Sequence, residues 1–357
     1  MIRAAAGNSA SQTRADALLP LRGFARLTQH RFNPSDFFGV CGQKSRAAAG
    51  RIDDDRLDLR GSDFCHGKLR IADRDFVESS NLQRQTMFTE RDASERIPKA
   101  IAAAAHIREI NSEIEVEAEI ADVNHSNIER LVRNCDVVLD GTDNFATRYL
   151  INDACVKHEI SWIYGAAVGS HGVTMTVQPH QTPCLRCVFQ EAPAPASTPT
   201  CDTAGVIMPI ISVVSAVQVA EALKLLSGQN ESLHRSLMQF DVWRNEWRKI
   251  NPGPPSADCL TCAQGRYATL EAASGDFAAV LCGRNAVQIS PAQATQLNFE
   301  ELAERLRLTG EVKFNDYLLR FQTGDFELTV FHDARSIIRG TNEIKIARSL
   351  YAKYIGN

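Results

Sequence analysis

The sequence predicts an α/β protein, built on a doubly wound and mainly parallel sheet, with a small C-terminal α+β domain. Two observations predict this fold. From residue 67 onward, short apolar segments typical of strands alternate with segments typical of helices. The apolar run Val137–Leu139 is followed at once by the polar turn Asp140–Asn144, as expected where a buried strand ends at a ligand-binding edge.

The composition is that of an ordinary globular protein. The chain has 357 residues, of which 44% are hydrophobic and 23% are charged, and its formal net charge is −4. This balance does not indicate a general nucleic-acid or membrane-surface binder. Because no uninterrupted apolar run approaches 18 residues and the N-terminal residues lack a continuous apolar signal region, we expect a cytoplasmic protein without a transmembrane helix.

The predicted elements fall into three segments. Residues 1–66 show neither helical nor strand periodicity and include a dense charge run, as in a solvated or disordered segment. The second segment is predicted to be the main domain, residues 67–264. Its predicted strands are 68–75, 114–120, 137–139 and 162–167, then a turn and an antiparallel strand within 169–177, and two short strands within 237–247. Its predicted helices are 98–110, 124–132, 145–157 and 206–226. The third is predicted to be a small domain, residues 265–357, with strands at 280–289, 311–314, 317–321 and 327–331 and helices at 299–308 and 342–354.

Local signals set several of these boundaries. Pro98 suits the first turn of a helix, and Asn124 and Asn144 are the expected N-caps of the next two helices. Gly228 is expected to end the long apolar helix, since glycine adopts the left-handed conformation that closes a helix.

Four side chains could bind a nucleotide. Asp73, near a strand end, could accept hydrogen bonds from ribose hydroxyls. Arg84, in a polar loop, could clamp a phosphate, although a surface arginine without a role is the simpler interpretation. Lys99 places a cation at the amino end of a helix, which is unfavourable unless an anion is bound. Asp143 could hold a magnesium ion beside a phosphate, or could merely cap the following helix.

Five cysteines are candidates for chemistry. Two CxxC pairs, Cys184 with Cys187 and Cys259 with Cys262, form the ligand set of a tetrahedral zinc site. The gap between the pairs is longer than in a zinc ribbon, so two separate redox pairs are the alternative. Zinc is favoured because both pairs lie in proline-flanked loops. Cys201, just before the long apolar helix, is either a nucleophile or sulfur acceptor or a plain small residue near a helix cap.

Residues 67–262 resemble the ThiF/MoeB/HesA family, the bacterial relatives of ubiquitin-activating enzymes. The resemblance rests on the motifs Asp73–Asp75, Ser80–Gln85, Pro98-Lys99, Leu139–Asn144, Tyr164–Ala167, the two CxxC pairs and Thr200-Cys201. It implies an E1-like, Rossmann-like sheet and ATP-dependent adenylylation of the C-terminal glycine carboxylate of a small β-grasp sulfur carrier of the ThiS or MoaD type. Such carriers serve thiamin or molybdopterin biosynthesis.

The resemblance also assigns roles to individual residues. It implies that Asp73 holds the ribose, that Asn81 belongs to the nucleotide site, and that Arg84 and Lys99 bind phosphates. It implies that Asp143 holds Mg²⁺, that the four paired cysteines hold Zn²⁺, and that Cys201 takes part in a sulfur or thioester step in some members.

The sequence departs from the family near its N-terminus. The family has a strand, a glycine-rich GxGxxG-type loop and a helix before the strand that starts here at Lys68, whereas this chain offers only Gly39–Gly42 with the wrong spacing. Residues 26–44 faintly resemble the family's N-terminal arm, with Gln29 in place of the arm's second arginine. Residues 45–66 resemble nothing in the family, and we predict that they form no ordered βαβ unit. A frameshift in the encoding DNA or a degenerate protein would explain this.

Three functional classes compete. An adenylyltransferase is favoured by the retained Asp143, Lys99 and Arg84, whereas the missing loop favours a carrier-binding or scaffold protein that has lost nucleotide binding. An NAD-linked oxidoreductase is the weakest of the three hypotheses, because the sequence has no glycine-rich dinucleotide-binding fingerprint. We expect a homodimer that binds a small sulfur carrier protein, and no nucleic-acid or membrane partner.

Overall fold

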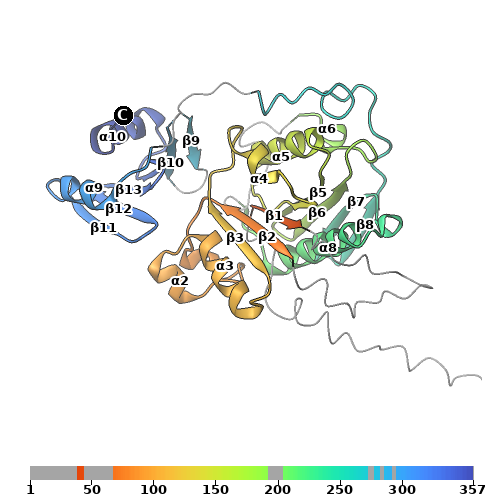
Figure 1. The fold of residues 1–357 in the computed structure, drawn as a ribbon, viewed down its shortest axis with the longest axis horizontal. Helices are drawn as coiled ribbons and strands as arrows, with labels where there is room; N and C mark the ends of the chain where they lie inside the picture. The colour runs from red at the N-terminus through yellow and green to blue at the C-terminus, as the bar shows by residue number, and fades with distance from the viewer. Residues whose placement is uncertain are drawn as a thin grey trace, which may run out of the picture.

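The computed structural model describes residues 38–43, 67–191, 204–271, 277–281, 285–291 and 295–356, with only the backbone described for residues 38–43, 277 and 279–281. These residues form two sheets that lie side by side (Figure 1). The first has eight strands in the order β3-β2-β1-β4-β5-β6-β7-β8, and the second has six in the order β11-β12-β13-β14-β10-β9.

The first sheet follows the predicted alternation of strands and helices. Its strands are β1 (Phe38–Gln43), β2 (Lys68–Asp73), β3 (Glu115–Ile120), β4 (Val137–Leu139), β5 (Ser161–Val168), β6 (His171–Val177), β7 (Leu237–Asp241) and β8 (Glu246–Ile250). Its helices are α2 (Glu90–Glu95), α3 (Lys99–Ile110), α4 (Ile128–Val132), α5 (Phe145–Lys157), α6 (Leu185–Val188) and α8 (Met208–Leu226), with 3₁₀ turns η3 (Ser79–Asn81) and η4 (Asn230–Ser232). The short helices α2 and α6 were not predicted. The N-cap of α4 is Asn127 rather than the predicted Asn124, whose side chain instead accepts from the amide of Ser126 at 2.9 Å.

The first sheet is mixed, which corrects the prediction of a mainly parallel sheet. β2 pairs with β3, and β4 with β5, in parallel, because a helix crosses between the two strands of each pair. β5 and β6, and likewise β7 and β8, are joined by short turns, so each pair is antiparallel. β6 and β7 are antiparallel as well.

β1 lies between β2 and β4 and was not predicted, because its part of the sequence lacks strand periodicity. It runs antiparallel to both neighbours, with Cys41 paired to Arg70 on one side and to Val138 on the other. β2 and β4 therefore run in the same direction, and their carboxyl ends meet at one edge of the sheet. The prediction that residues 45–66 form no ordered βαβ unit concerns residues outside the described ranges.

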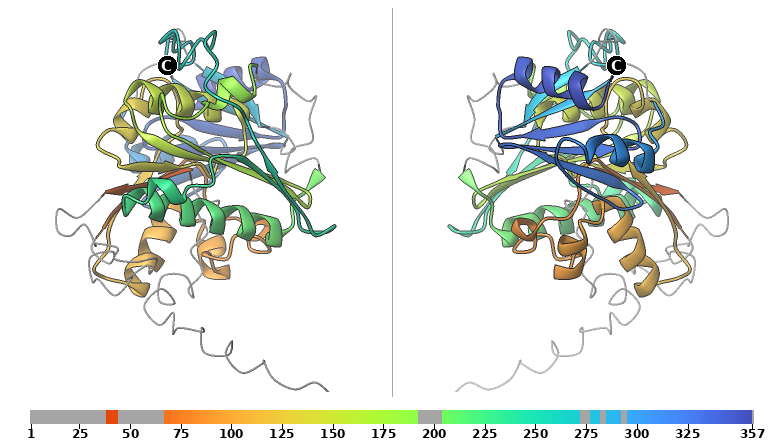
Figure 2. Two further views of the ribbon diagram at one scale, coloured as in Figure 1. Left: turned by 90° about the vertical axis from the view of Figure 1, so that its right-hand side faces the viewer. Right: turned by 90° about the vertical axis from the view of Figure 1, so that its left-hand side faces the viewer.

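Helices cover both faces of the first sheet, as in a doubly wound fold (Figure 2). Side chains alternate along each strand, so neighbouring residues of β4 face opposite layers. Val138 packs in the cluster formed with α4 and α5, whereas Val137 and Leu139 pack against Ala222 of α8. α3 covers the same face as α8 and packs its alanines on Ile71 of β2.

α8 is long and apolar enough to cross a membrane by length and composition alone, although polar residues interrupt its apolar run. These polar residues belong to the core: Ser215, Gln218 and Glu221 are buried. Gln218 Nε2 donates to the carbonyls of Asp140 and Ile163, at 2.9 Å each. Glycine at position 165 permits this approach, since a Cβ there would lie 2.6 Å from Gln218 Nε2. The contacts place α8 as a core helix of the sheet.

The second sheet is antiparallel throughout and carries two helices. Its strands are β9 (Phe277–Leu281), β10 (Ala286–Ser290), β11 (Glu311–Phe314), β12 (Leu318–Thr323), β13 (Phe326–Phe331) and β14 (Ser336–Arg339), with helices α9 (Phe299–Leu306) and α10 (Ile344–Tyr354). The single strand predicted at 280–289 is a pair of strands, β9 and β10, and β14 was not predicted. The predicted domain boundary at 264 and 265 stays a prediction; Tyr267 and Leu270 pack against the first sheet's core.

Candidate functional site

The carboxyl ends of β2 and β4 bring two acidic turns to one edge of the first sheet. Asp73 is the last residue of β2, and Asp143 lies in the turn after β4. The charge of Arg74 is influenced by carboxylates of both turns. Burial lowers the pKa of its guanidinium, but Asp75, Asp122 and Asp143 outweigh burial and hold that pKa above its ordinary value. Positive charge at Arg74 therefore faces carboxylates from three segments of the chain.

Asp73 is a half-buried carboxylate held by its own turn. Its Oδ1 accepts a hydrogen bond from the amide of Asp75 at 2.7 Å. The pKa of Asp73 is raised from 3.8 to about 6, mainly by burial and with a smaller contribution from Asp75, while Lys99 lowers it in part. A carboxyl group with such a pKa changes charge just below neutral pH.

Lys99 is the first residue of α3, as predicted, and its side chain is only 8% exposed. Its Nζ lies 3.6 Å from Asp75 Oδ2, and its amide donates to the carbonyl of Asp75 at 2.9 Å. A cation at a helix amino end is unfavourable, and here Asp75 supplies a compensating anion from within the chain. Asp73, Asp75 and Lys99 thus form one compact charged cluster.

Asp143 does not cap the following helix, which removes the simpler interpretation of this residue. The N-cap of α5 is Asn144, as predicted, and its side chain accepts from the amide of Thr147 at 2.9 Å. Asp143 is exposed at the tip of the turn. Its carboxylate is therefore accessible to an ion or a ligand.

A buried ion pair fixes the turn that carries Asp143. The side chain of Asp140, 1% exposed, accepts from the amide of Thr142 at 2.8 Å and from its hydroxyl at 2.7 Å. Arg148 of α5 donates from Nη2 to the carbonyl of Thr142 at 2.5 Å, and its Nε lies 3.4 Å from Asp140 Oδ2. Burial raises the pKa of Asp140, whereas Arg148 lowers it. Sequence analysis did not identify this pair, although both residues flank the predicted site.

The loop after β2 contains the two remaining candidates for nucleotide binding. Arg84 is half-buried, and its Nη1 donates to the carbonyl of Ser80 at 2.9 Å. Asn81 is 3% exposed, and its side chain accepts from the amide of Glu78 at 3.2 Å. Asn81 therefore holds the shape of this loop. Cys201 lies outside the described residues.

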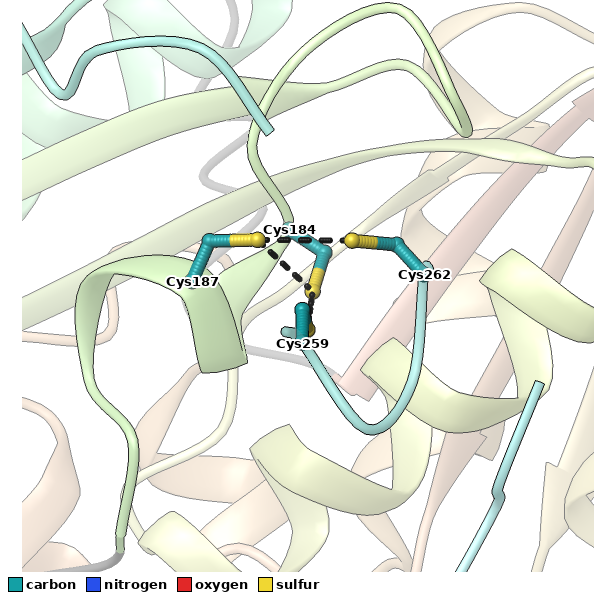
Figure 3. Close-up of side chains that lie close together, drawn as sticks. All are labelled: Cys184, Cys187, Cys259 and Cys262. Atoms are coloured by element: carbon teal, nitrogen blue, oxygen red, sulfur yellow. Dashed lines mark hydrogen bonds between the residues drawn. The ribbon is translucent and has the colours of Figure 1, made fainter. Parts of the chain in front are cut away.

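The four paired cysteines converge on one point (Figure 3). The Sγ–Sγ distances are 3.8 Å for Cys184 and Cys187, 3.6 Å for Cys184 and Cys259, and 3.3 Å for Cys187 and Cys262, and all four sulfur atoms lie within 4.8 Å of one another. Thiolates around a tetrahedral ion such as zinc lie about 3.8 Å apart. The structure thus brings the two pairs into one cluster that could hold a metal ion.

Without a bound cation, the four thiols do not ionise together. Burial and hydrogen bonds to Cys187 and Cys259 raise the pKa of Cys262 to about 12. A hydrogen bond with Cys187, and then burial, raise the pKa of Cys184 well above its ordinary value. Four thiolates at these distances would repel one another, so a bound cation would be needed to hold them all ionised.

Buried polar residues of α5 anchor the two cysteine loops. Asp153, fully buried, accepts hydrogen bonds from the hydroxyls of Thr261 at 2.9 Å and Thr269 at 2.6 Å, and Arg186 Nε lies 3.3 Å from it. Asn152 accepts from the amide of Leu185 at 2.8 Å. These residues were not predicted, because a polar residue within a helix carries no sequence signal for a distant loop.

The chain matches known proteins over most of its described length. The family model described as the ThiF family matches residues 59–261. The chain is 44% identical over 292 residues to the sulfur carrier protein ThiS adenylyltransferase of Bacillus subtilis, covering 81% of this chain and 86% of that protein. It is 38% identical over 205 residues to the SAMP-activating enzyme E1 of Haloferax volcanii, covering 57% and 74%. A crystal structure of E. coli MccB with MccA-N7isoASN aligns with a TM-score of 0.48 and 21% identity, covering 55% of this chain and 59% of that one.

Replacing Asp73 with asparagine should stabilise the fold at neutral pH. The pKa of Asp73 is about 6 in the folded chain, against an ordinary value of 3.8, so the folded state binds the proton more tightly. The stabilising contribution of this group is complete below about pH 4 and is lost as the pH rises through about 6. An asparagine side chain cannot ionise, so urea unfolding at about pH 7.5 should give Asp73→Asn a free energy of unfolding higher by on the order of 1–3 kcal/mol.

The stability difference between this variant and the wild type should largely disappear at about pH 4. Asp316→Asn, at an exposed aspartate of the second sheet, is the control and should show no such pH dependence. An equal stability gain for Asp73→Asn at both pH values would contradict the prediction.

Proposed function

The chain belongs to the ThiF family, and we propose that it adenylylates the C-terminal carboxylate of a small sulfur carrier protein of the ThiS or MoaD type. Such a carrier would serve thiamin or molybdopterin biosynthesis. The single observation that carries this proposal is the charged edge where Asp73, Lys99 and Asp143 come from separate segments. A nucleotide with its phosphates needs cations and an accessible carboxylate together at such an edge.

The chemistry requires two anions to meet. A carboxylate is a poor acylating agent, and attack of its oxygen on the α-phosphorus of ATP forms an acyl-adenylate and releases pyrophosphate. Lys99 and Arg84 would bind phosphates and Asp73 would hold the ribose, while Asn81 would keep the shape of the loop that carries Arg84. Asp143 would hold Mg²⁺, whose charge would offset that of the phosphates. The ion pair of Asp140 and Arg148 keeps the turn of Asp143 in place during this step.

We propose that the cysteine cluster holds one structural zinc ion. Four sulfur ligands and no other donor are typical of a closed structural site rather than a catalytic one, which keeps a position open. The loops that carry the cysteines pack on α5, so the ion would tie residues 184–187 and 259–262 to the sheet.

Cys201 is proposed to act after adenylylation, in a sulfur or thioester step. Its thiol is not needed to form the adenylate, because that reaction consumes only the carboxylate and ATP. Loss of Cys201 should therefore separate the two steps.

A carrier-binding protein without adenylylation is the second candidate, favoured by one observation. β1 is antiparallel to β2 and β4, so its carboxyl end points away from the edge that holds Asp73. A phosphate-binding loop placed directly after β1 would begin at the opposite edge of the sheet. Binding of a carrier without pyrophosphate exchange would support this alternative.

We propose that the protein is a homodimer joined along α8. This helix covers the sheet with one face and leaves the other exposed, with Met208, Pro209, Ser212, Ala216 and Ala220 on it. An apolar, uncharged helical face of this length is typical of a protein–protein interface. Small side chains at spacings of four residues would let a second copy of the helix approach closely.

Placing a charge on this face should dissociate the dimer. Ala216→Arg would bury a guanidinium at the centre of the proposed interface, which costs several kcal/mol without a partner charge. Sedimentation velocity should give a dimer for the wild type and a monomer for Ala216→Arg. Ala105→Arg, at an exposed position of α3, is the matched control and should remain dimeric. A monomeric wild type would contradict this assignment.

Purified protein should contain one zinc ion per chain by mass spectrometry. Cys259→Ser should lower the zinc content and the thermal stability, because metal binding contributes directly to folding free energy. Cys155→Ala, which alters a buried cysteine of α5 outside the cluster, should keep its zinc. Native protein without zinc, or a Cys259→Ser variant with full occupancy, would be inconsistent with the site.

Asp143→Ala should abolish most ATP–pyrophosphate exchange in the presence of the carrier. If Asp143 holds Mg²⁺ at the phosphate, the contact strengthens in the transition state, so kcat should fall by on the order of 10²-fold, more than ATP affinity does. Asp136→Ala, at the other end of β4, is the control and should keep normal exchange.

Cys201→Ala should keep normal exchange and fail only in a later sulfur or thioester step. Near-normal exchange in Asp143→Ala would remove Asp143 from the site. Loss of exchange in folded Cys201→Ala would show that the two steps are not separate.

A further inference from the structure

The C-terminal domain reaches the charged edge of the first sheet with two buried side chains. Arg335, in the turn between β13 and β14, is 2% exposed, and its Nη2 donates to the carbonyl of Arg74 at 3.1 Å. Gln288 of β10 is fully buried, and its Nε2 donates to Asp122 Oδ2 at 2.5 Å. Both contacts cross from the second sheet to residues that follow strands of the first.

These contacts continue to the candidate nucleotide residues. Arg74 Nη1 lies 3.0 Å from Asp122 Oδ1, and Arg74 Nε lies 3.8 Å from Asp75 Oδ1. Asp75 in turn donates its amide to Asp73 and pairs with Lys99 at 3.6 Å. Asp73 and Lys99 are thus linked to the C-terminal domain through two intervening residues, Arg74 and Asp75.

Burial of the Arg335 guanidinium is unfavourable for the folding of its own hairpin. Its guanidinium carbon lies 3.7 Å from the ring centroid of Phe331, and within the described residues its Nε and Nη1 have no hydrogen-bond partner. Burying a guanidinium costs several kcal/mol unless nearby anions compensate for it. Besides Asp333 of its own turn, the compensating carboxylates are Asp122 and Asp75 of the other domain. The charge of Arg335 is therefore compensated from both sides of the contact, first by Asp333 of its own turn and then by Asp122 and Asp75, while Arg74 opposes it.

An apolar cluster and two further ion pairs also join the C-terminal domain to the first domain. Phe76, two residues after Arg74, is buried in a cluster with four apolar residues of the second sheet: Ala286, Leu318, Phe331 and Ile337. Arg339 pairs with Glu78, and Arg96 pairs with Glu327 at 3.5 Å. The segment from Asp73 to Glu78 is therefore held by the C-terminal domain on one side, and by Ile97 and Lys99 of the first domain on the other.

We propose that the C-terminal domain positions the nucleotide edge, and that Arg335 is the positioning residue that holds the Asp73–Asp75 turn against Asp122. The part of this inference that concerns nucleotide binding rests on the proposed function. The domain contributes no group to the reacting atoms; it fixes the carbonyl of Arg74 and, through Gln288, the carboxylate to which Arg74 binds. Loss of the contact would loosen the turn while the first sheet stays folded.

The test compares Arg335→Met with Arg335→Lys and with a matched control. Methionine still packs on Phe331 but removes the N–H donor to Arg74 and the positive charge. Lysine keeps the positive charge but lacks the planar guanidinium group with its several N–H donors. Arg305→Met is the control, because Arg305 donates to the carbonyls of Tyr354 and Ile355 within the same domain, at 3.0 and 3.1 Å. Circular dichroism and thermal unfolding establish that each variant is folded.

The first readout is hydrogen exchange and does not depend on any nucleotide. The amide of Asp75 donates to the Asp73 carboxylate, and that of Ala121 donates to the Asp73 carbonyl at 3.2 Å. Arg335→Met should speed exchange of these two amides by about tenfold or more, Arg335→Lys by less, and Arg305→Met not at all. Equal exchange in Arg335→Met and Arg305→Met would overturn the proposal, because it would leave Arg335 with only a general structural role.

The second readout is the dissociation constant of MgATP measured by calorimetry. It should rise by about tenfold in Arg335→Met and stay within about twofold of the wild type in Arg305→Met. A normal MgATP affinity together with faster amide exchange would overturn the assignment to the nucleotide site. If the wild type binds no MgATP, the proposed function fails, and hydrogen exchange alone decides whether Arg335 positions the turn.

Discussion

The guanidinium of Arg74 lets three acidic segments share one edge of the first sheet. Asp75 follows β2, Asp122 follows β3 and Asp143 follows β4, and their carboxylates would repel one another without a cation between them. Arg74 supplies that cation from the turn that starts at Asp73. The placement of Asp73, Lys99 and Asp143 on this edge depends on this charge balance, as does the contact that the second sheet makes there.

α5 connects this edge to the cysteine cluster. Its N-cap Asn144 follows Asp143, and Arg148, one helical turn further on, donates to the turn that carries Asp143. Asn152 and Asp153, one turn further again, hold the cysteine loops. These residues recur at spacings of about four, so they follow one side of the helix. A helix rises about 1.5 Å per residue, which places the two regions about 12 Å apart along a rigid rod. A metal ion in the cluster would thus stabilise the element that positions Asp143.

β1 shows how a sheet can be completed by a segment without strand periodicity. Backbone groups alone supply its ladder to β2 and β4, and a central strand satisfies those groups on both sides. Because β1 is antiparallel to β2 and β4, its direction affects which groups lie at the edge of Asp73. The edge of Asp73 then has cations from Lys99 and Arg74, whereas β1 itself ends at the opposite edge of the sheet. The balance between adenylylation and carrier binding depends on whether these side chains suffice to hold the phosphates.

The sequence by itself determined the features that depend on near neighbours in the chain. The bounds of α5 and its cap at Asn144, the place of Lys99 at the start of α3, and the two CxxC pairs all follow from patterns within a few residues. Only the tertiary structure decided the direction of β1, the ion pair between Arg74 and Asp122, and the contact that Arg335 makes from a hairpin more than two hundred residues away. Periodicity and capping are local properties of the backbone. Contacts between distant charged side chains depend instead on the path of the whole chain, because any acid could pair with any base until the core sets which ones face each other.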